Sequence, residues 1–292
     1  NRTLTSNYEE SIWLMKTLRR LFEKHLKQSV EFSIDVNLAQ CENNKQTEFW
    51  RKTFNDCGVT ELCLDFIAVG IETPLTLEAI NLLVVLLARS DGCLEIQTSI
   101  YKSLKNRDSS PFFLQLKEVL ADILSWFQKE AELIETQSDD IGENVLILPD
   151  ENSIFTLIQL MCTGDYLPLK NYMREQDGNS AQVNIPSILA SVLDYLSRRE
   201  SPLFTHMTVY VVHTIRLLMH GPCRGNQKYF IMGTEVLISL NRLIRLSRPK
   251  TQLLTMAWNL NIEKLKESII DVLRSCVEGF LKNSPIYDRI MS

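Results

Sequence analysis

The chain has little glycine and proline, with 10 and 9 residues respectively among 292. These residues form many tight turns, so their scarcity favours long helices over many short strands. No segment alternates apolar and polar residues as a half-buried strand does. Apolar residues instead recur at three- and four-residue steps, for example in Tyr8–Phe32. The pattern predicts an almost purely α-helical chain.

An uninterrupted apolar run of membrane length is also missing, and so is a signal peptide. The strongest candidate, Ala79–Ala88, is too short to cross a bilayer and contains Asn81. We interpret it as a central helix of a helical stack. The chain starts without Met and inside a helical pattern, so we expect it to be a piece of a longer polypeptide.

No C-x-x-C pair occurs, although the chain has seven cysteines, an odd number. Cysteine packs as a small apolar residue, so we expect buried free thiols in a reducing compartment. The net charge of -5 argues against a general nucleic-acid binder. The Asn1–Thr3 glycosylation sequon is expected to be idle. The cysteines are Cys41, Cys57, Cys63, Cys93, Cys162, Cys223 and Cys276.

Motifs of common enzymes are absent: the chain has no G-x-S-x-G, P-loop, G-x-G-x-x-G or EF-hand sequence. We therefore expect neither an enzyme nor a bound cofactor. Three histidines, His206, His213 and His220, follow at seven-residue steps on one expected helix. A metal bound by two histidines of a helix requires three- or four-residue spacing, so this stripe is interpreted as structural.

Basic residues gather towards the end of the chain. A solvated helix face is the simplest interpretation, and cations are also favoured near helix C-termini. The alternative is a surface that receives an acidic partner segment or a phosphate. The residues are Arg198, Arg199, Arg224, Lys228, Arg242, Arg245, Arg248 and Lys250.

An acidic stretch at residues 130–151 contains eight carboxylates and no basic residue. Such a stretch is typical of a solvated linker, so it divides the chain into a first helical segment at 1–129 and a second at 152–292. Short turns between helices favour stacked antiparallel pairs, as in an armadillo/HEAT-like α-solenoid. Predicted helices include Glu48–Cys57, Val59–Val69, Leu75–Ala88, Leu94–Leu104, Pro111–Ile134, Ser153–Cys162, Leu167–Gln176, Pro186–Arg198, Leu203–His220, Gln227–Leu246 and Gln252–Leu281.

The second half of the chain contains short sequence motifs that resemble those of a known family. Leu157–Cys162 and Leu169–Gln176 resemble the L-Q-L-x-C and L-Q-N-F-L-R-x-Q stretches of inositol trisphosphate receptors and ryanodine receptors, the intracellular calcium-release channels. Gly221–Gln227 resembles the G-P-C-x-x-N-Q of the same family. The resemblance covers roughly residues 150 to 281. The matched motif residues are Cys162, Asn171, Arg174, Gly221, Pro222, Cys223, Asn226 and Gln227.

The first half resembles the family more weakly. Gly92–Leu104 is similar to its G-N-x-x-V-Q-x-S-x-Y-x-x-L element, and the acidic stretch matches the position of a charged insert in the family. The resemblance implies a cytosolic armadillo-like layer of a homotetrameric channel in the endoplasmic reticulum membrane. Its partners would be other domains and subunits of that channel, and it would relay ligand signals to the pore. We lean to the inositol trisphosphate receptor branch.

The family's activating calcium site is implied by the same motifs, and this chain departs from it. The two glutamates of the family fall on Thr163 and Leu217, and its His and Gln fall on Asp165 and His220. Calcium needs several oxygen ligands, with carboxylates supplying negative charge. Both key carboxylates are lost, so we expect weak or no calcium binding. The alternative to a channel layer is a soluble armadillo-like adaptor that binds a peptide or helix in its groove.

Overall fold

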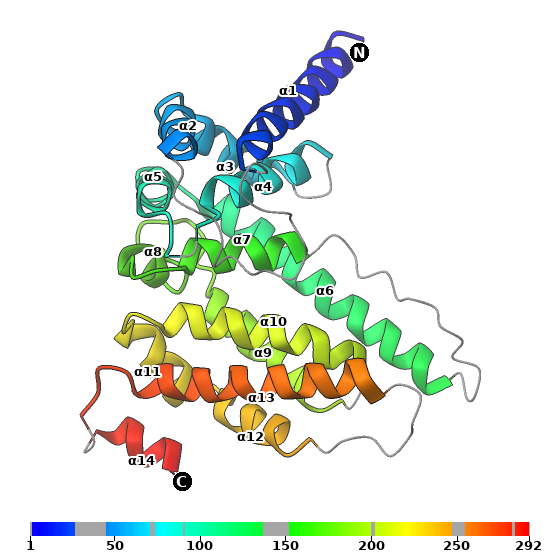
Figure 1. Ribbon diagram of the computed structural model, residues 1–292, viewed down its shortest axis with the longest axis vertical. Helices are drawn as coiled ribbons and strands as arrows, with labels where there is room; N and C mark the ends of the chain where they lie inside the picture. The colour runs from blue at the N-terminus through cyan, green and yellow to red at the C-terminus, as the bar shows by residue number, and fades with distance from the viewer. Residues whose placement is uncertain are drawn as a thin grey trace. The chain divides into compact units, whose positions relative to one another are not determined.

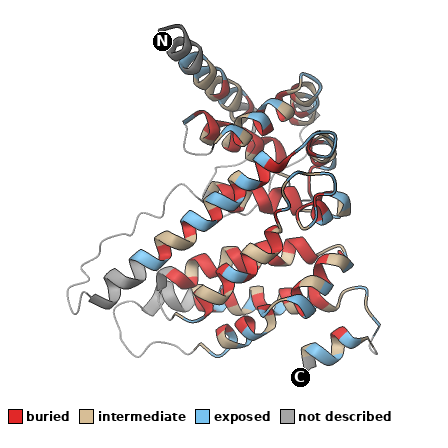
Figure 2. Ribbon diagram, turned by 180° about the vertical axis from the view of Figure 1, so that it is seen from behind, coloured by how far each residue is buried: buried red, intermediate tan, exposed pale blue. Residues whose placement is uncertain are grey.

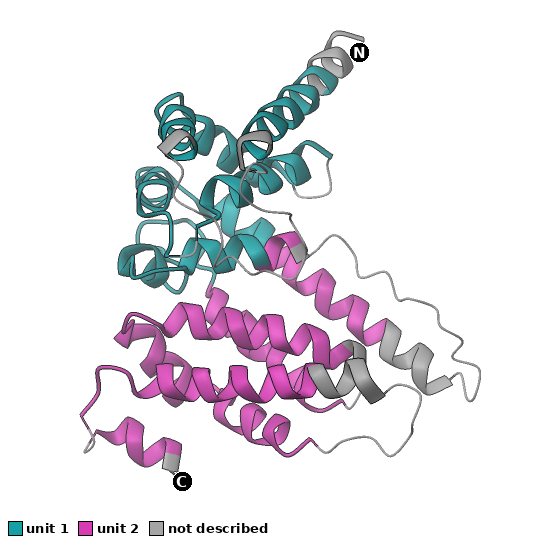
Figure 3. Ribbon diagram, viewed as in Figure 1, with its two compact units in different colours: residues 1–116, 156–183 teal, residues 117–155, 184–292 magenta. Residues whose placement is uncertain are grey.

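The computed structural model describes residues 2–26, 45–70, 74–89, 91–136, 152–199, 202–246, 255–281 and 284–291. Within these ranges every regular element is an α-helix and no strand occurs (Figure 1). The predicted all-α, solenoid-like fold class is therefore confirmed. The chain forms two compact units (Figure 3). Unit 1 consists of residues 1–116 and 156–183, and unit 2 consists of residues 117–155 and 184–292.

Unit 1 is built around one apolar helix. Its elements are α1 (Arg2–Leu26), α2 (Lys45–Asp56), α3 (Val59–Val69), α4 (Pro74–Leu87), α5 (Leu94–Lys105), the start of α6 (Ser110–Thr136), most of α7 (Asn152–Cys162) and α8 (Leu167–Tyr172). Helix α4 packs against α1 and α3 and buries most of its residues. Figure 2 shows the buried residues of the whole chain in red. This burial explains why α4 is apolar on nearly all sides.

Unit 2 is a layer of packed helices in which α10 lies between α9 and α13. Unit 2 also contains the rest of α6 and the start of α7. Asn184 caps α9 because its Oδ1 accepts the backbone N–H of Ser187 at 2.9 Å, and Pro186 occupies the first turn. The remaining helices are α9 (Ile185–Ser197), α10 (Pro202–Met219), α11 (Arg224–Gly233), α12 (Val236–Ile244), α13 (Thr255–Val277) and α14 (Pro285–Met291).

Several predicted helix limits differ from the structure. The single helix predicted at Gln227–Leu246 is wrong, because Thr234 is extended and divides it into α11 and α12. Its Oγ1 accepts the N–H of Val236 at 3.3 Å and so stabilises the new start. Helix α8 ends at Tyr172 instead of Gln176. The break predicted at Gly58 is confirmed, since its φ of 77° is the left-handed conformation that glycine adopts readily.

The acidic stretch lies largely outside the described residues. Helix α6 extends through Thr136, so the first residues of the stretch are helical, while 137–151 are not described. The domain limits at 129/130 and 151/152 stay a prediction. The compact units follow a different division, because each combines residues from both sides of this stretch. None of the described helices is both long enough and apolar enough to cross a membrane.

The thiols follow the expectation with one exception. All cysteines among the described residues are free, and most are buried. Cys57 is exposed at the turn after α2, so the prediction of burial is wrong there. Cys41 lies outside the described residues.

Candidate functional site

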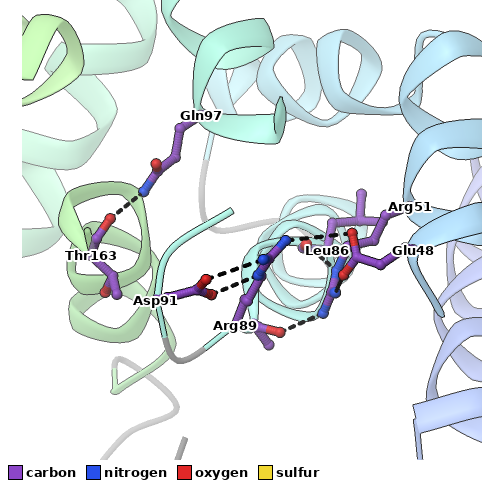
Figure 4. Close-up of polar contacts among 8 residues, drawn as sticks. Glu48, Arg51, Leu86, Arg89, Asp91, Gln97 and Thr163 are labelled. Carbon is purple, nitrogen blue, oxygen red and sulfur yellow. Dashed lines mark hydrogen bonds and ion pairs between the residues drawn. The ribbon is translucent and has the colours of Figure 1, made fainter. Parts of the chain in front are cut away.

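The first motif, at 92–104, holds the end of α7 inside unit 1. Gln97 points from α5 to the last turn of α7 and is only 1% exposed (Figure 4). Its Nε2 lies 3.0 Å from the carbonyl oxygen of Leu160, 3.3 Å from that of Met161 and 2.7 Å from that of Thr163. Carbonyls at the end of a helix lack intrahelical partners, and burial makes an unpaired carbonyl costly. Gln97 is therefore the C-terminal anchor of α7.

Two glycines allow this approach. Gly92, before α5, and Gly164, after α7, have φ values of 86° and 78°. A Cβ on Gly92 would lie 2.4 Å from the carbonyl oxygen of Thr163, and one on Gly164 would lie 2.6 Å from that of Asp91. Real Cβ atoms do not approach oxygens so closely. The two turns therefore cross backbone to backbone, which only glycine permits at either position.

An ion-pair network holds the other side of the same turn, also within unit 1 (Figure 4). Arg51 of α2 is buried, and its Nε donates to the carbonyl of Leu86 at 3.1 Å while its Nη1 lies 2.6 Å from a Glu48 oxygen. Arg89 donates to Asp91 at 2.6 Å. The hydrogen bond from Arg89 lowers the pKa of Asp91 below its ordinary value. The end of α4 and the start of the motif turn are thereby held in one geometry.

Tyr172 and Gln176, in the second motif, fix the segment after α7. The Tyr172 hydroxyl donates to the carbonyl of Leu104 at 3.1 Å, at the end of the first motif. Gln176 is fully buried, and its Nε2 donates to the carbonyls of Tyr172 at 2.6 Å and Val183 at 2.9 Å, while its Oε1 accepts the N–H of Val183. The loop between α8 and α9 is closed by this side chain together with that of Gln182, whose Oε1 accepts the Gln176 N–H at 3.0 Å.

The other residues of the second motif differ in setting. Cys162 is fully buried at the end of α7, whereas Asn171 is exposed on α8. Arg174 is half-buried and lies 3.3 Å from Glu175. These three positions thus comprise one in the core and two at the surface or its edge.

The third motif, at 221–227, joins α10, α11 and α13 inside unit 2. Asn226 Nδ2 donates to the carbonyl of Leu218 at 3.0 Å, in the last turn of α10. Gln227 Nε2 donates to the carbonyls of Ser275 at 2.6 Å and Glu278 at 3.0 Å, at the end of α13. Both amides are fully buried. The Asn-Gln pair is therefore two C-terminal anchors for two different helices.

The G-P-C part of this motif forms the turn between α10 and α11. Gly221 has a φ of 84°, and its N–H donates to a Glu278 carboxylate oxygen at 3.3 Å. Pro222 faces Gly279, where a Cβ would lie 3.0 Å from the proline Cγ. Cys223 is buried, and its N–H donates to the carbonyl of Met219 at 2.9 Å. Each letter of the motif thus has a structural role.

The four positions matched to the family calcium site fall in both units. Thr163 and Asp165 belong to unit 1, and Leu217 and His220 belong to unit 2. The Thr163 hydroxyl donates to the carbonyl of Gln159 at 2.8 Å, and the Asp165 side chain is exposed. Thr163 therefore supplies a local helix contact in place of a charge.

Leu217 and His220 offer no carboxylate in unit 2. Leu217 is 6% exposed in the packed face of α10, so this position is part of the apolar core. His220 Nδ1 lies 3.4 Å from Glu278 at the end of α13. In the part of the chain that the structure describes, no three His, Cys, Asp or Glu side chains are grouped so that they could hold a metal ion.

His206 and His213 of the expected stripe are separate structural residues of α10. The His206 ring packs edge-on against Tyr210, with 5.2 Å between ring centroids. His213 is largely buried, and this burial, with the nearby Arg216 charge, lowers its pKa to about 4 although Asp271 acts in the opposite direction. His213 is therefore neutral near pH 7.

The His213 pKa predicts a loss of stability in mild acid. The unfolded chain takes up a proton near pH 6.5 and the folded chain only near pH 4, so the stabilisation is complete above pH 6.5 and is lost as the pH falls towards 4. The free energy of unfolding of His213→Phe should therefore fall by about 2 kcal/mol less between pH 7 and pH 4 than that of the unchanged protein. This figure is reduced to allow for the partial exposure of the imidazole. Urea denaturation of both proteins at pH 7, 5.5 and 4 measures the difference. Parallel pH curves for the two proteins would contradict the expectation.

Sequence reasoning found the motif letters but not the contacts that they make, and it missed Arg51 and Arg89. One signal was available. Gln97 follows the spacing of the buried Ile100 and Leu104, and Arg51 lies three residues before the buried Phe54. A polar residue at a core-facing helix position indicates a buried hydrogen-bond anchor, because such groups are buried only with partners.

A comparison with known families covers part of this chain, from α7 to α12. Residues 151–244 match the family model described as "RyR and IP3R Homology associated". The match spans α7 to α12 and includes the second and third motifs with their buried amides. It supports the resemblance drawn from the letters of the sequence. This part of the chain is therefore similar to the homology-associated domain of ryanodine and inositol trisphosphate receptors.

Proposed function

We propose that this chain is a regulatory helical layer of a calcium-release channel related to the inositol trisphosphate receptors. It acts on the cytosolic face of the endoplasmic reticulum membrane, within a homotetramer, and couples ligand signals to the pore. The observation that carries the proposal is the family match over residues 151–244. The proposal assigns the layer no catalytic role and no cofactor, and the use of its motif residues as helix anchors is in keeping with that.

Anchored helix ends suit a layer that transmits movement. Gln97 ties α5 to α7, and Asn226 and Gln227 tie α11 to α10 and α13. Each of these amide side chains is buried and links helices at their ends, where fraying normally begins. A unit held in this way moves as a rigid body, and rigid-body movement is a common route by which channels and other switches pass a signal.

The polypeptide that contains this chain tests the proposal. Antibodies raised against the 292-residue chain will detect it in cell fractions, and chemical cross-linking will report its subunit number. We expect an integral membrane protein that resists alkaline extraction and cross-links to tetramers. A monomer recovered entirely in the soluble fraction would overturn the channel proposal and favour an adaptor.

A second part of the proposal is that activation by calcium at the family site has been lost. The two positions that carry glutamates in the family hold Thr163 and the buried Leu217, neither of which supplies a charged oxygen. Asp165 adds a single exposed carboxylate, and one carboxylate without others binds calcium only weakly.

Isothermal titration with calcium chloride will show no micromolar binding to the chain. The physical reason is the missing charge, because ligand charge count tunes calcium affinity. Asp165→Asn is expected to leave the titration unchanged, as is the matched control Asp177→Asn in another exposed turn. Micromolar binding that disappears in Asp165→Asn and persists in Asp177→Asn would show that the site is intact.

A further inference from the structure

Helices α9 and α12 of unit 2 are joined at their C-terminal ends by one carboxylate. Asp194 accepts from Arg198 at 2.9 and 3.0 Å and from Arg242 at 2.7 Å. Partial burial raises the pKa of Asp194, but the hydrogen bonds and charges of the two arginines outweigh it and keep the pKa below its ordinary value. The carboxylate is therefore charged near neutral pH, and it holds two guanidinium groups in fixed positions.

Among the described residues, more positive than negative charge lies around Asp194. We call Arg198, Arg242 and Arg245 the arginine cluster, and Asp194 is the carboxylate that pairs with the first two. The Arg199 guanidinium lies over the Tyr195 ring, 4.8 Å from its centroid, which orients it as well. Arg245 is exposed, and within the described residues its side chain forms neither a hydrogen bond nor an ion pair. Arg245 follows Arg242 by three residues, about one helical turn, so within the described residues three arginines gather around one carboxylate in a chain whose net charge is -5.

Arg198 and Arg242 each keep guanidinium N–H donors that Asp194 does not use. Arg198 is 56% exposed and directs Nε and Nη2 to Asp194, which leaves Nη1 open. Arg242 uses only Nη1, so its Nε and Nη2 donate to none of the described protein atoms. Cations near a helix C-terminus are favoured by the helix dipole, which accounts for charge at each end. The dipole does not account for donors that are ordered and still unused.

The position of Asp194 decides what kind of ligand fits. A lone phosphate placed between Arg198 and Arg242 would meet the Asp194 carboxylate, and like charges repel at that distance. The open donors belong to two different side chains, Arg198 at the C-terminal cap of α9 and Arg242 in α12. A ligand with several separated carboxylates can pair with more than one arginine while keeping its charges away from Asp194.

We propose that the arginine cluster at the ends of α9 and α12 binds an extended, carboxylate-rich segment of a partner protein. Arginine suits this role because its planar fork pairs with carboxylates through two parallel hydrogen bonds. Exposed ion pairs are individually weak, so the binding is transient and sensitive to salt. The surface is separate from the motif anchors and does not depend on the proposed channel function.

Fluorescence anisotropy tests the proposal on the 292-residue chain. The probe is a fluorescein-labelled synthetic peptide of about twelve residues that alternates glutamate and glycine, with a glutamine version as the neutral control. We expect the glutamate peptide to bind and the neutral one not to bind. Arg198→Gln combined with Arg245→Gln should weaken binding about fivefold, as expected for two exposed ion pairs. Arg245→Gln alone should weaken it about twofold, and among the described residues the Arg245 side chain has no hydrogen bond or ion pair to lose.

A matched pair of substitutions controls for overall charge. Lys264→Gln with Arg274→Gln removes the same two positive charges from exposed positions of α13, and the affinity should stay unchanged. Equal weakening in this control pair would overturn the proposal, because it would show binding to net charge alone. Displacement of the peptide by inorganic phosphate at equal ionic strength would overturn it as well, since it would indicate a site for one anion. Equal binding of the neutral peptide would exclude carboxylate recognition.

Discussion

Gly92→Ala will destabilise unit 1 by about 4 kcal/mol. Two effects add. The φ of 86° is unfavourable for a residue with a Cβ, and the added methyl would lie 2.4 Å from the carbonyl oxygen and 2.9 Å from the carbonyl carbon of Thr163. These atoms are backbone and cannot rotate away, so the crossing of the two turns must open. Urea denaturation followed by far-UV circular dichroism measures the loss, and hydrogen exchange of α5 and α7 amides assigns it to unit 1.

Gly178→Ala separates the two effects. This glycine also has a positive φ, 93°, and belongs to unit 1, but a Cβ there would meet nothing within 4 Å. It should therefore lose only about 1 kcal/mol, the conformational part. Gly164→Ala should resemble Gly92→Ala, because its Cβ would lie 2.6 Å from the Asp91 carbonyl oxygen. Equal losses in Gly92→Ala and Gly178→Ala would show that the crossing does not contribute to stability.

The helical fold was readable from the sequence because helix formation depends on neighbours three and four residues apart. The apolar steps predicted the main helices, and Gly58 marked the break between α2 and α3. The break in the helix at Thr234 could not be predicted from the sequence, because Gln227–Leu246 keeps a helical pattern of apolar residues across it. The structure ends α11 there by an extended residue, and the new helix start is stabilised by a side-chain contact that the pattern does not encode.

The glutamine and asparagine side chains that anchor the helix ends could be predicted from the sequence only in part, for a related reason. Gln97, Asn226 and Gln227 lie within the motifs found in the sequence. Their acceptors, however, are carbonyls far along the chain, 63 residues from Gln97 for Leu160 and 48 from Gln227 for Ser275. Backbone carbonyls are the same in every residue, so no letter marks the partner. The burial of Leu217 follows from the sequence, because this leucine continues the apolar face of α10.

Gln97→Met will destabilise unit 1 by about 3 kcal/mol. Methionine matches glutamine closely in length and fills the same space, so packing is preserved and only the amide donor is removed. The carbonyls of Leu160, Met161 and Thr163 then lose the side-chain donor that lies within 3.3 Å of each. A buried carbonyl without a partner costs about 1–3 kcal/mol, and water cannot enter freely beside a fully buried side chain. Urea denaturation measures the difference in the free energy of unfolding.

Gln128→Met is the matched control, because Gln128 is exposed on α6 and the same chemical change there should alter stability by less than about 0.5 kcal/mol. A double-mutant cycle with Gly92→Ala then tests whether both residues act on the same helix end. Once the alanine has moved Thr163 away, Gln97 has less to lose, so the combined loss should fall about 1 kcal/mol or more below the sum of the single losses. Strict additivity would mean that the glycine crossing and the glutamine anchor stabilise different parts of unit 1.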